Sequence, residues 1–173
     1  MMTEYLEETN NILLQVYYEF AVFLYLAQTK SSNRYIHNIM VDSMRIHMRV
    51  LADFFSTKED NRKNKSDLLC SDLLDSSHSI SINLSPRIRK YINKNTTHFT
   101  RERGKVTISD QEFSDAVSDI VSAIYKFVSL VNEGNLKKDY FALLDDKAIK
   151  EIRSDVNIKL LYFYLRNNNS ISQ

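Results

Sequence analysis

Glycine, proline, cysteine and tryptophan are scarce in this chain, and each shortage narrows what the protein can be. The 173 residues include two glycines, one proline, one cysteine and no tryptophan. A sheet-rich fold needs many tight turns, which glycine and proline mostly supply, so their scarcity predicts long helices with few breaks. Because Cys70 is the only cysteine, an intrachain disulfide and a cysteine-rich metal site are both excluded.

An excess of one charge and long apolar runs are also lacking. The formal net charge is +1, which excludes a uniformly basic coat but leaves local basic patches open. The apolar run at 12–27 is interrupted by Gln15 and Glu19, and it is shorter than the roughly 20 residues that a membrane span needs. The first residues lack the basic and apolar regions of a signal peptide, so we expect a cytoplasmic protein without a membrane partner.

Common catalytic motifs are missing from the sequence. It contains no Gly-rich phosphate loop, no Gly-x-Ser-x-Gly elbow and no His-Glu-x-x-His pair. The Glu-x-x-His pairs that hold di-metal centres in helical bundles are missing as well. The four histidines, at positions 37, 47, 78 and 98, are scattered along the chain. We therefore expect no metal ion and no cofactor.

What the chain does contain is a series of apolar stripes with the period of an α-helix. They predict an all-α fold, a single antiparallel bundle of five to six helices over residues 1–166, with a disordered tail at 167–173. The first helix is apolar nearly all round in its second half, so we expect it in the middle of the bundle. The expected helices, some of them short, cover about 3–30, 34–56, 67–75, 86–103, 109–133, 136–144 and 146–166.

Several helix ends carry local signals. Ser85 and Pro86 suit the N-cap and the first helical position, where the missing N–H of proline costs nothing. Ser109 and Glu112 have the spacing of a capping box, and Gly134 is placed to end the helix that follows. Before Pro86, alternating serine and apolar residues predict an extended segment packed on the bundle.

Residues 86–105 are the most basic part of the chain. They hold seven basic residues and one acidic residue, Glu102, a net charge of +6. Clustered cations bind nucleic acids by neutralising backbone phosphates. The candidates for such an interface are Arg87, Arg89, Lys90, Lys94, Arg101 and Lys105. The alternative is a solvated face whose arginines lie beside the acidic residues of segment 109–119.

His98 lies within this basic segment and allows two interpretations. In the first, His98 acts as a general acid or base on a phosphodiester, with Arg103 stabilising the developing charge and Asn93 alongside. In the second, His98 is a hydrogen-bonded residue that ties its helix to the helix over 34–56. The helix over 34–56 contains three candidates for a polar contact within the core. They are His47, Arg49 and Asp53.

Two stretches, "RIHMRVLADFF" (45–55) and "INKNTTHFTRER" (92–103), carry a family resemblance. They resemble an uncharacterised group of bacterial all-helical proteins in which a His-x-Arg-x-Leu-x-Asp-Phe-Phe helix precedes a His-x-Thr-x-x-Arg segment. The arrangement is also loosely similar to HEPN domains, helical bundles that include metal-independent ribonucleases of toxin and phage-defence systems. This resemblance implies RNA cleavage centred on His98. The HEPN pattern places an arginine shortly before the histidine, and Asn93 stands at that spacing here.

Two hypotheses of different classes follow. In the first, the chain is a cytoplasmic binding or interaction module that pairs with a second copy or with another, unidentified protein. Its aromatic segment "LLYFYL" (160–165) is then either a subunit interface or part of the core. In the second, the chain binds or cleaves RNA without a metal ion, through the region of His98. Whether the protein is an enzyme stays open.

Overall fold

The computed structural model of the chain describes residues 2–56, 67–96 and 105–169. These residues are mainly helical, and apart from an isolated bridge between Leu74 and Leu136 they contain no β-structure. The predicted all-α fold is confirmed. The helices are α1 (Met2–Gln28), α2 (Arg34–Phe54), α3 (Cys70–Leu73), α4 (Pro86–Thr96), α5 (Asp110–Asn132), α6 (Lys138–Phe141), the 3-10 helix η2 (Ala142–Asp145) and α7 (Lys147–Asn169).

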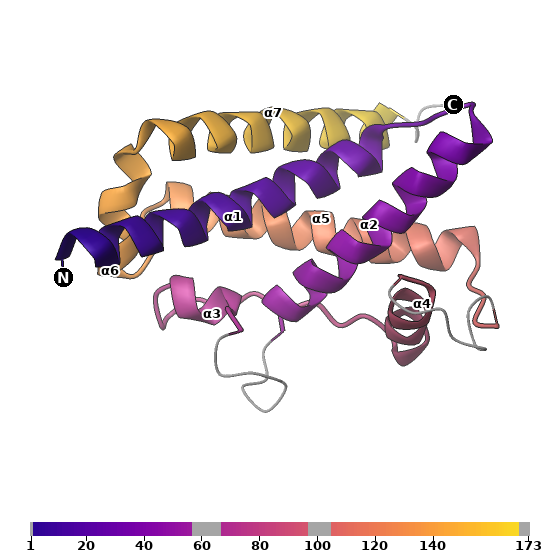
Figure 1. The fold of residues 1–173 in the computed structure, drawn as a ribbon, viewed down its shortest axis with the longest axis horizontal. Coiled ribbons are helices and arrows are strands. Elements are labelled where there is room, and N and C mark those ends of the chain that lie inside the picture. The colour runs from indigo at the N-terminus through magenta and orange to yellow at the C-terminus, as the bar shows by residue number, and fades with distance from the viewer. Residues whose placement is uncertain (1, 57–66, 97–104, 170–173) are drawn as a thin grey trace.

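Helix α1 begins at one end of the molecule and packs most extensively against α7 (Figure 1). These two helices run in the same direction, because the chain returns along α5 and then turns through α6 and η2 at the end where α1 begins. Their last turns meet, since Arg166 Nη1 donates to the carbonyl oxygen of Gln28 at 2.7 Å. The antiparallel arrangement expected from the sequence therefore applies to α5 against α1 and α7, whereas α1 and α7 are parallel.

Four phenylalanines form the centre of the core. Phe20 of α1, Phe54 and Phe55 at the end of α2, and Phe127 of α5 lie with ring centroids between 4.9 and 6.4 Å apart, mostly edge to face. All four side chains are buried. Aromatic pairs in this geometry add to the stabilisation that apolar burial provides. The cluster therefore joins three helices that come from distant parts of the sequence.

Local hydrogen bonds stabilise the helix ends. Asn33 caps α2, where its Oδ1 accepts from the backbone N–H of Tyr35 at 3.0 Å. The capping box predicted for α5 is confirmed: Ser109 Oγ accepts from the Glu112 N–H at 3.1 Å, and the Glu112 carboxylate accepts from the Ser109 N–H at 2.8 Å. This second bond holds the pKa of Glu112 below its usual range. Gly134 ends the helix with φ of 86°, a conformation that a Cβ atom disfavours.

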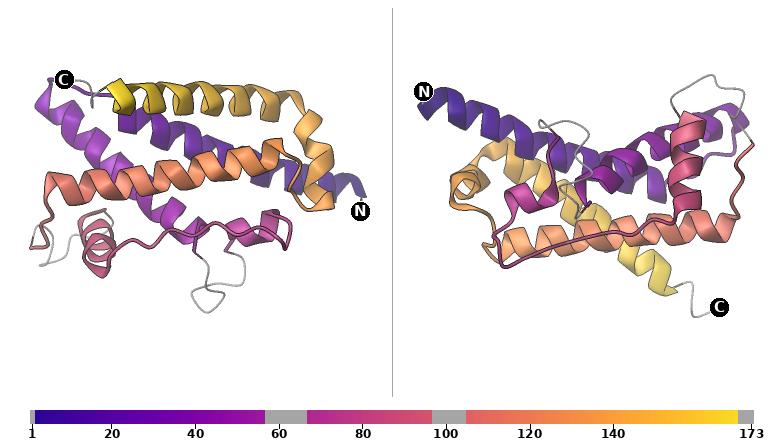
Figure 2. Two further views of the ribbon diagram at one scale, coloured as in Figure 1. Left: turned by 180° about the vertical axis from the view of Figure 1, so that it is seen from behind. Right: turned by 90° about the horizontal axis from the view of Figure 1, so that it is seen from below.

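The segment before α4 is extended and packs on the bundle, as its alternating pattern predicts. Ile80, Ile82 and Leu84 are buried, while the polar residues between them are exposed, and the segment runs along α5 (Figure 2). Ser85 then caps α4 by accepting from the backbone N–H of Ile88 at 3.2 Å. Helix α7 continues to Asn169, so residues 167–169, which were expected in a disordered tail, are helical.

Candidate interaction surfaces

A groove of about 910 Å³ lies between α5 and α7. Tyr125 of α5 lines one wall, and Leu161 and Tyr164 of α7 line the other. Ser118 and Ser122, one helical turn apart on α5, face the groove with small side chains that leave space between the two helices. The described residues that line the groove are all uncharged at neutral pH.

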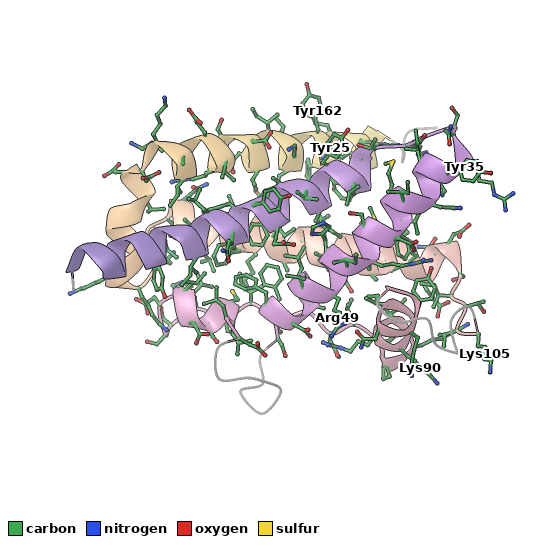
Figure 3. The ribbon with its side chains drawn as sticks, viewed as in Figure 1. Tyr25, Tyr35, Arg49, Lys90, Lys105 and Tyr162 are labelled. Carbon is green, nitrogen blue, oxygen red and sulfur yellow. The ribbon has the colours of Figure 1, made fainter. Side chains whose placement is uncertain are left out.

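The apolar surface continues from the groove over the outer face of α7. The exposed residues of this face are Ile158, Leu161, Tyr162, Tyr164 and Leu165. Figure 3 shows Tyr162 directed away from the bundle. Leu160 is buried and Phe163 is partly buried against the core. The segment 160–165 thus contributes to the core on one side and leaves an apolar surface on the other.

The charged residues of the second half of α7 lie on the side that faces α1. Lys159 pairs with Asp155 and lies over the ring of Tyr25, with 5.9 Å between its Nζ and the ring centroid. Arg166 donates to the carbonyl oxygen of Gln28 in α1. These contacts hold the positive charges away from the groove.

Another exposed apolar stripe lies on α2. Tyr35 is 80% exposed, and Ile39 and Ile46 on the same side of the helix are also exposed. This stripe lies on a different helix from the groove. A substitution of Tyr35 can therefore serve as a control for a substitution of a tyrosine beside the groove.

Helix α4 carries most of the predicted nucleic-acid residues. Its sequence contains four basic residues and no acidic one. The apolar residues Ile88 and Ile92 are buried, so the basic residues occupy the remaining, outward part of the helix. These basic residues are Arg87, Arg89, Lys90 and Lys94.

The structure brings Lys105 together with this basic face. A hollow of about 440 Å³ is lined by Arg87, Lys90 and Lys105, together with neighbouring residues. The Arg87 guanidinium is fixed beside it: Nη2 donates to the carbonyl oxygen of Thr107 at 2.9 Å, and Nη1 lies 3.2 Å from Glu112 Oε1. Of the acidic residues of segment 109–119, Glu112 therefore neutralises part of the basic face, through its contact with Arg87.

Helix α4 is attached to α2 through Arg45. The Arg45 guanidinium lies over the ring of Tyr91, 4.7 Å from its centroid, and also donates to the Tyr91 hydroxyl. Nη1 of the same residue donates to Asp42 at 2.7 Å. The Tyr91 ring also meets Phe113 edge to face at 6.4 Å. Tyr91 is thus occupied within the fold and does not add an aromatic surface to the basic face.

His47 makes a polar contact between helices, and its partner is Glu19. His47 Nδ1 lies 2.6 Å from Glu19 Oε2, which joins α2 to α1 at a partly buried position. Arg49 is partly buried and Asp53 is exposed. Sequence reasoning did not select Glu19 as a site residue. The signal for it was present, because Glu19 interrupts an apolar run and His47 lies on an apolar stripe, and two such residues often satisfy each other.

The predicted catalytic group falls mainly outside the described residues. His98, Arg103 and also Arg101 of the predicted interface lie in segment 97–104, which the structure does not describe. Asn93 is exposed on α4. The catalytic role of these residues therefore stays a prediction.

The described residues offer no obvious metal centre. Within residues 2–56, 67–96 and 105–169, no three histidine, cysteine or acidic side chains are grouped so that they could hold a metal ion. Cys70 is buried, and this burial raises the pKa of its thiol to about 12. The thiol is therefore protonated at neutral pH and acts as a packing residue. None of the helices in the described part of the chain is long and apolar enough to cross a membrane.

Compared with protein-family models, with curated proteins and with solved structures, the chain shows no match. The resemblance to HEPN domains and to the bacterial helical group therefore stays a prediction.

Proposed function

We propose that the protein is a helical interaction module that forms a homodimer through the groove between α5 and α7. The observation that carries the proposal is an uncharged groove beside an exposed apolar ridge on α7. The ridge is formed by Leu161, Tyr164 and Leu165. Interface cores are depleted of charged residues and enriched in aromatic ones, and this surface has both properties.

A second copy of the chain suits this surface better than a charged partner. In a two-fold symmetric dimer the same patch is used twice, and residues near the axis meet their own copies. A charge at that position would face a like charge, whereas tyrosine and leucine can pack against themselves. Lys159 and Arg166 are held on the α1 side and leave the groove side uncharged. The ridge of one copy can then enter the groove of the other.

The area available fits a reversible dimer. Tyr125, Tyr162 and Tyr164 are each between 62% and 65% exposed, and Ile158, Leu161 and Leu165 between 48% and 58%. With roughly 200 Å² for a whole tyrosine and somewhat less for leucine, these residues expose on the order of 600 Å². A standard interface buries about 800 Å² on each partner. The remaining residues that line the groove add to this area. The whole surface therefore lies at the lower end of the range for stable interfaces.

The test replaces one tyrosine of the ridge with arginine and compares it with a matched tyrosine elsewhere. Tyr164→Arg introduces a charge into the proposed interface, and Tyr35→Arg introduces the same charge on α2, where Tyr35 is 80% exposed. In sedimentation velocity over a range of concentrations, we expect dimers for the wild type and for Tyr35→Arg, and monomers for Tyr164→Arg. Far-UV circular dichroism should show the same helix content in all three.

Two other results would overturn the proposal. A wild type that stays monomeric at every concentration means that the groove does not serve a second copy, and another protein then becomes the candidate occupant. Dissociation by Tyr35→Arg with no effect of Tyr164→Arg means that the dimer forms through α2 instead.

A reducing, cytoplasmic setting accords with this function. Cys70, the only cysteine, is a buried free thiol, so the fold and the proposed dimer need no disulfide. Such a dimer would form without a covalent bond between its two copies.

A further inference from the structure

Positive charge is concentrated on α4, where Arg87 and Lys90 are exposed and Arg89 and Lys94 are partly buried. Four basic residues and no acidic residue occupy its eleven positions, although the whole chain has a net charge of only +1. The helix is fixed to the bundle by buried Ile88 and Ile92 and by the contact of Arg45 with Tyr91. The charges are therefore presented on a rigid element.

Neighbouring carboxylates neutralise this face only in part. Glu112 pairs with Arg87 at 3.2 Å, and Asp115 accepts a hydrogen bond from Gln111 on its own helix. Among the residues that the structure describes, no ion pair joins Lys90 or Lys105 to a carboxylate. Both lysines are exposed. Their charges are available to an external anion.

Lys90 and Lys105 line the same hollow, which has room for a phosphate group. The hollow measures about 440 Å³, and Pro86 and Thr107 also line it. Figure 3 shows Lys90 and Lys105 at the same end of the molecule, both directed away from the bundle. Arg87 stands beside them in a fixed position, because Thr107 and Glu112 hold its guanidinium.

We propose that the outward face of α4, with Lys90 and Lys105 at its centre, binds the phosphate backbone of a nucleic acid. Clustered lysine and arginine residues bind such a backbone by releasing its counterions. Tyr91 is engaged by Arg45 and Phe113, so the face has no free aromatic ring from α4 on which bases could stack. The contact is therefore to phosphates and is independent of base sequence.

An anionic membrane is the competing partner, and the face suits it less well. Helices that lie on membranes combine a basic face with exposed large apolar residues that enter the lipid. The isoleucines of α4 are buried in the protein core instead. The face therefore offers charge without an apolar anchor.

The test measures binding of a short, fluorescently labelled single-stranded RNA by anisotropy over a range of salt concentrations. The variant is Lys90→Gln with Lys105→Gln. The matched control is Lys147→Gln with Lys150→Gln, which removes the same charge from exposed lysines at the start of α7, where Glu151 and Asp145 lie nearby. We expect the variant to bind about tenfold more weakly, and the slope of log K against log salt to fall by about 1.4, since each lost phosphate contact removes about 0.7. The control should bind like the wild type, and a second RNA of unrelated sequence should give the same affinities.

Other outcomes would overturn the proposal. Absence of RNA binding by the wild type at low salt would do so, as would equal weakening by both variants, which would indicate a general effect of net charge. Anionic phospholipid vesicles that displace the RNA and bind with higher affinity would assign the face to a membrane. Because Lys90 and Lys105 lie outside the α5–α7 groove, sedimentation of the same variants keeps this result separate from that of the dimer.

Discussion

Replacing Tyr17 with phenylalanine should make the protein more stable. Tyr17 is completely buried in α1, and its hydroxyl has no hydrogen-bond partner among the described residues. A buried polar group without a partner costs about 1–3 kcal/mol of desolvation, which the substitution removes. The ring itself stays in place, so its edge-to-face contact with Phe20, at 6.0 Å, is kept. We expect the free energy of unfolding to rise by about 1 kcal/mol or more near neutral pH.

The same substitution should have a larger effect in alkaline solution. Burial raises the pKa of Tyr17 from 10.0 to about 12, an effect that nearby Arg153 partly offsets. A raised pKa means that the neutral form is favoured in the folded state, so this stability is present below the unfolded pKa and is lost as the pH rises from 10.0 through about 12. At about pH 11 the wild type has lost on the order of 1 kcal/mol through this group. Phenylalanine has no such loss.

The assay is urea unfolding, followed by circular dichroism, near neutral pH and at about pH 11. Tyr18→Phe is the matched control, because Tyr18 is the next residue of α1 and is 58% exposed. It should change stability by less than about 0.5 kcal/mol at either pH. If Tyr17→Phe is destabilising near neutral pH and the difference from the wild type does not grow with pH, the hydroxyl has a partner and the reasoning is wrong.

Two further predictions concern the buried thiol and the attachment of α4. Burial raises the pKa of Cys70 from 9.0 to about 12, so the native thiol should react with a thiol reagent only as fast as the protein unfolds. Rapid stoichiometric labelling of the native protein would contradict this prediction. Tyr91→Phe should lower the free energy of unfolding by about 1–3 kcal/mol, because Arg45 loses a hydrogen-bond acceptor while the ring below its guanidinium is kept. Urea unfolding measures this loss, and an unchanged midpoint would mean that the hydroxyl does not hold α4.

The parts of the fold that could be predicted are those that depend on neighbouring residues. The capping box needs only Ser109 and Glu112, which are three positions apart. Pro86 at the start of α4 and Gly134 after α5 act through their own backbone restrictions. The extended segment before α4 could be predicted as well, because successive side chains of an extended chain point alternately to the core and to the solvent.

The arrangement of the helices could not be predicted in the same way. The parallel pairing of α1 with α7 shows in contacts such as that of Arg166 with Gln28, which are 138 residues apart. Apolar periodicity says which face of a helix is buried, and it does not say which helix covers that face or in which direction. The groove is missed for the same reason: Ser118 and Ser122 are readable as a small, polar face of α5, but the space above them depends on where α7 lies.

The two proposed surfaces lie on opposite sides of α5, with α7 on one side and α4 on the other (Figures 1 and 2). A dimer formed through the α5–α7 groove would therefore leave the basic face of α4 exposed on both copies. Two such faces on one particle would bind a long nucleic acid more tightly than one, because the second contact becomes intramolecular. A short RNA that reaches only one face does not gain from pairing. Its affinity therefore reports on a single basic face, while the gain on a longer strand depends on the dimer.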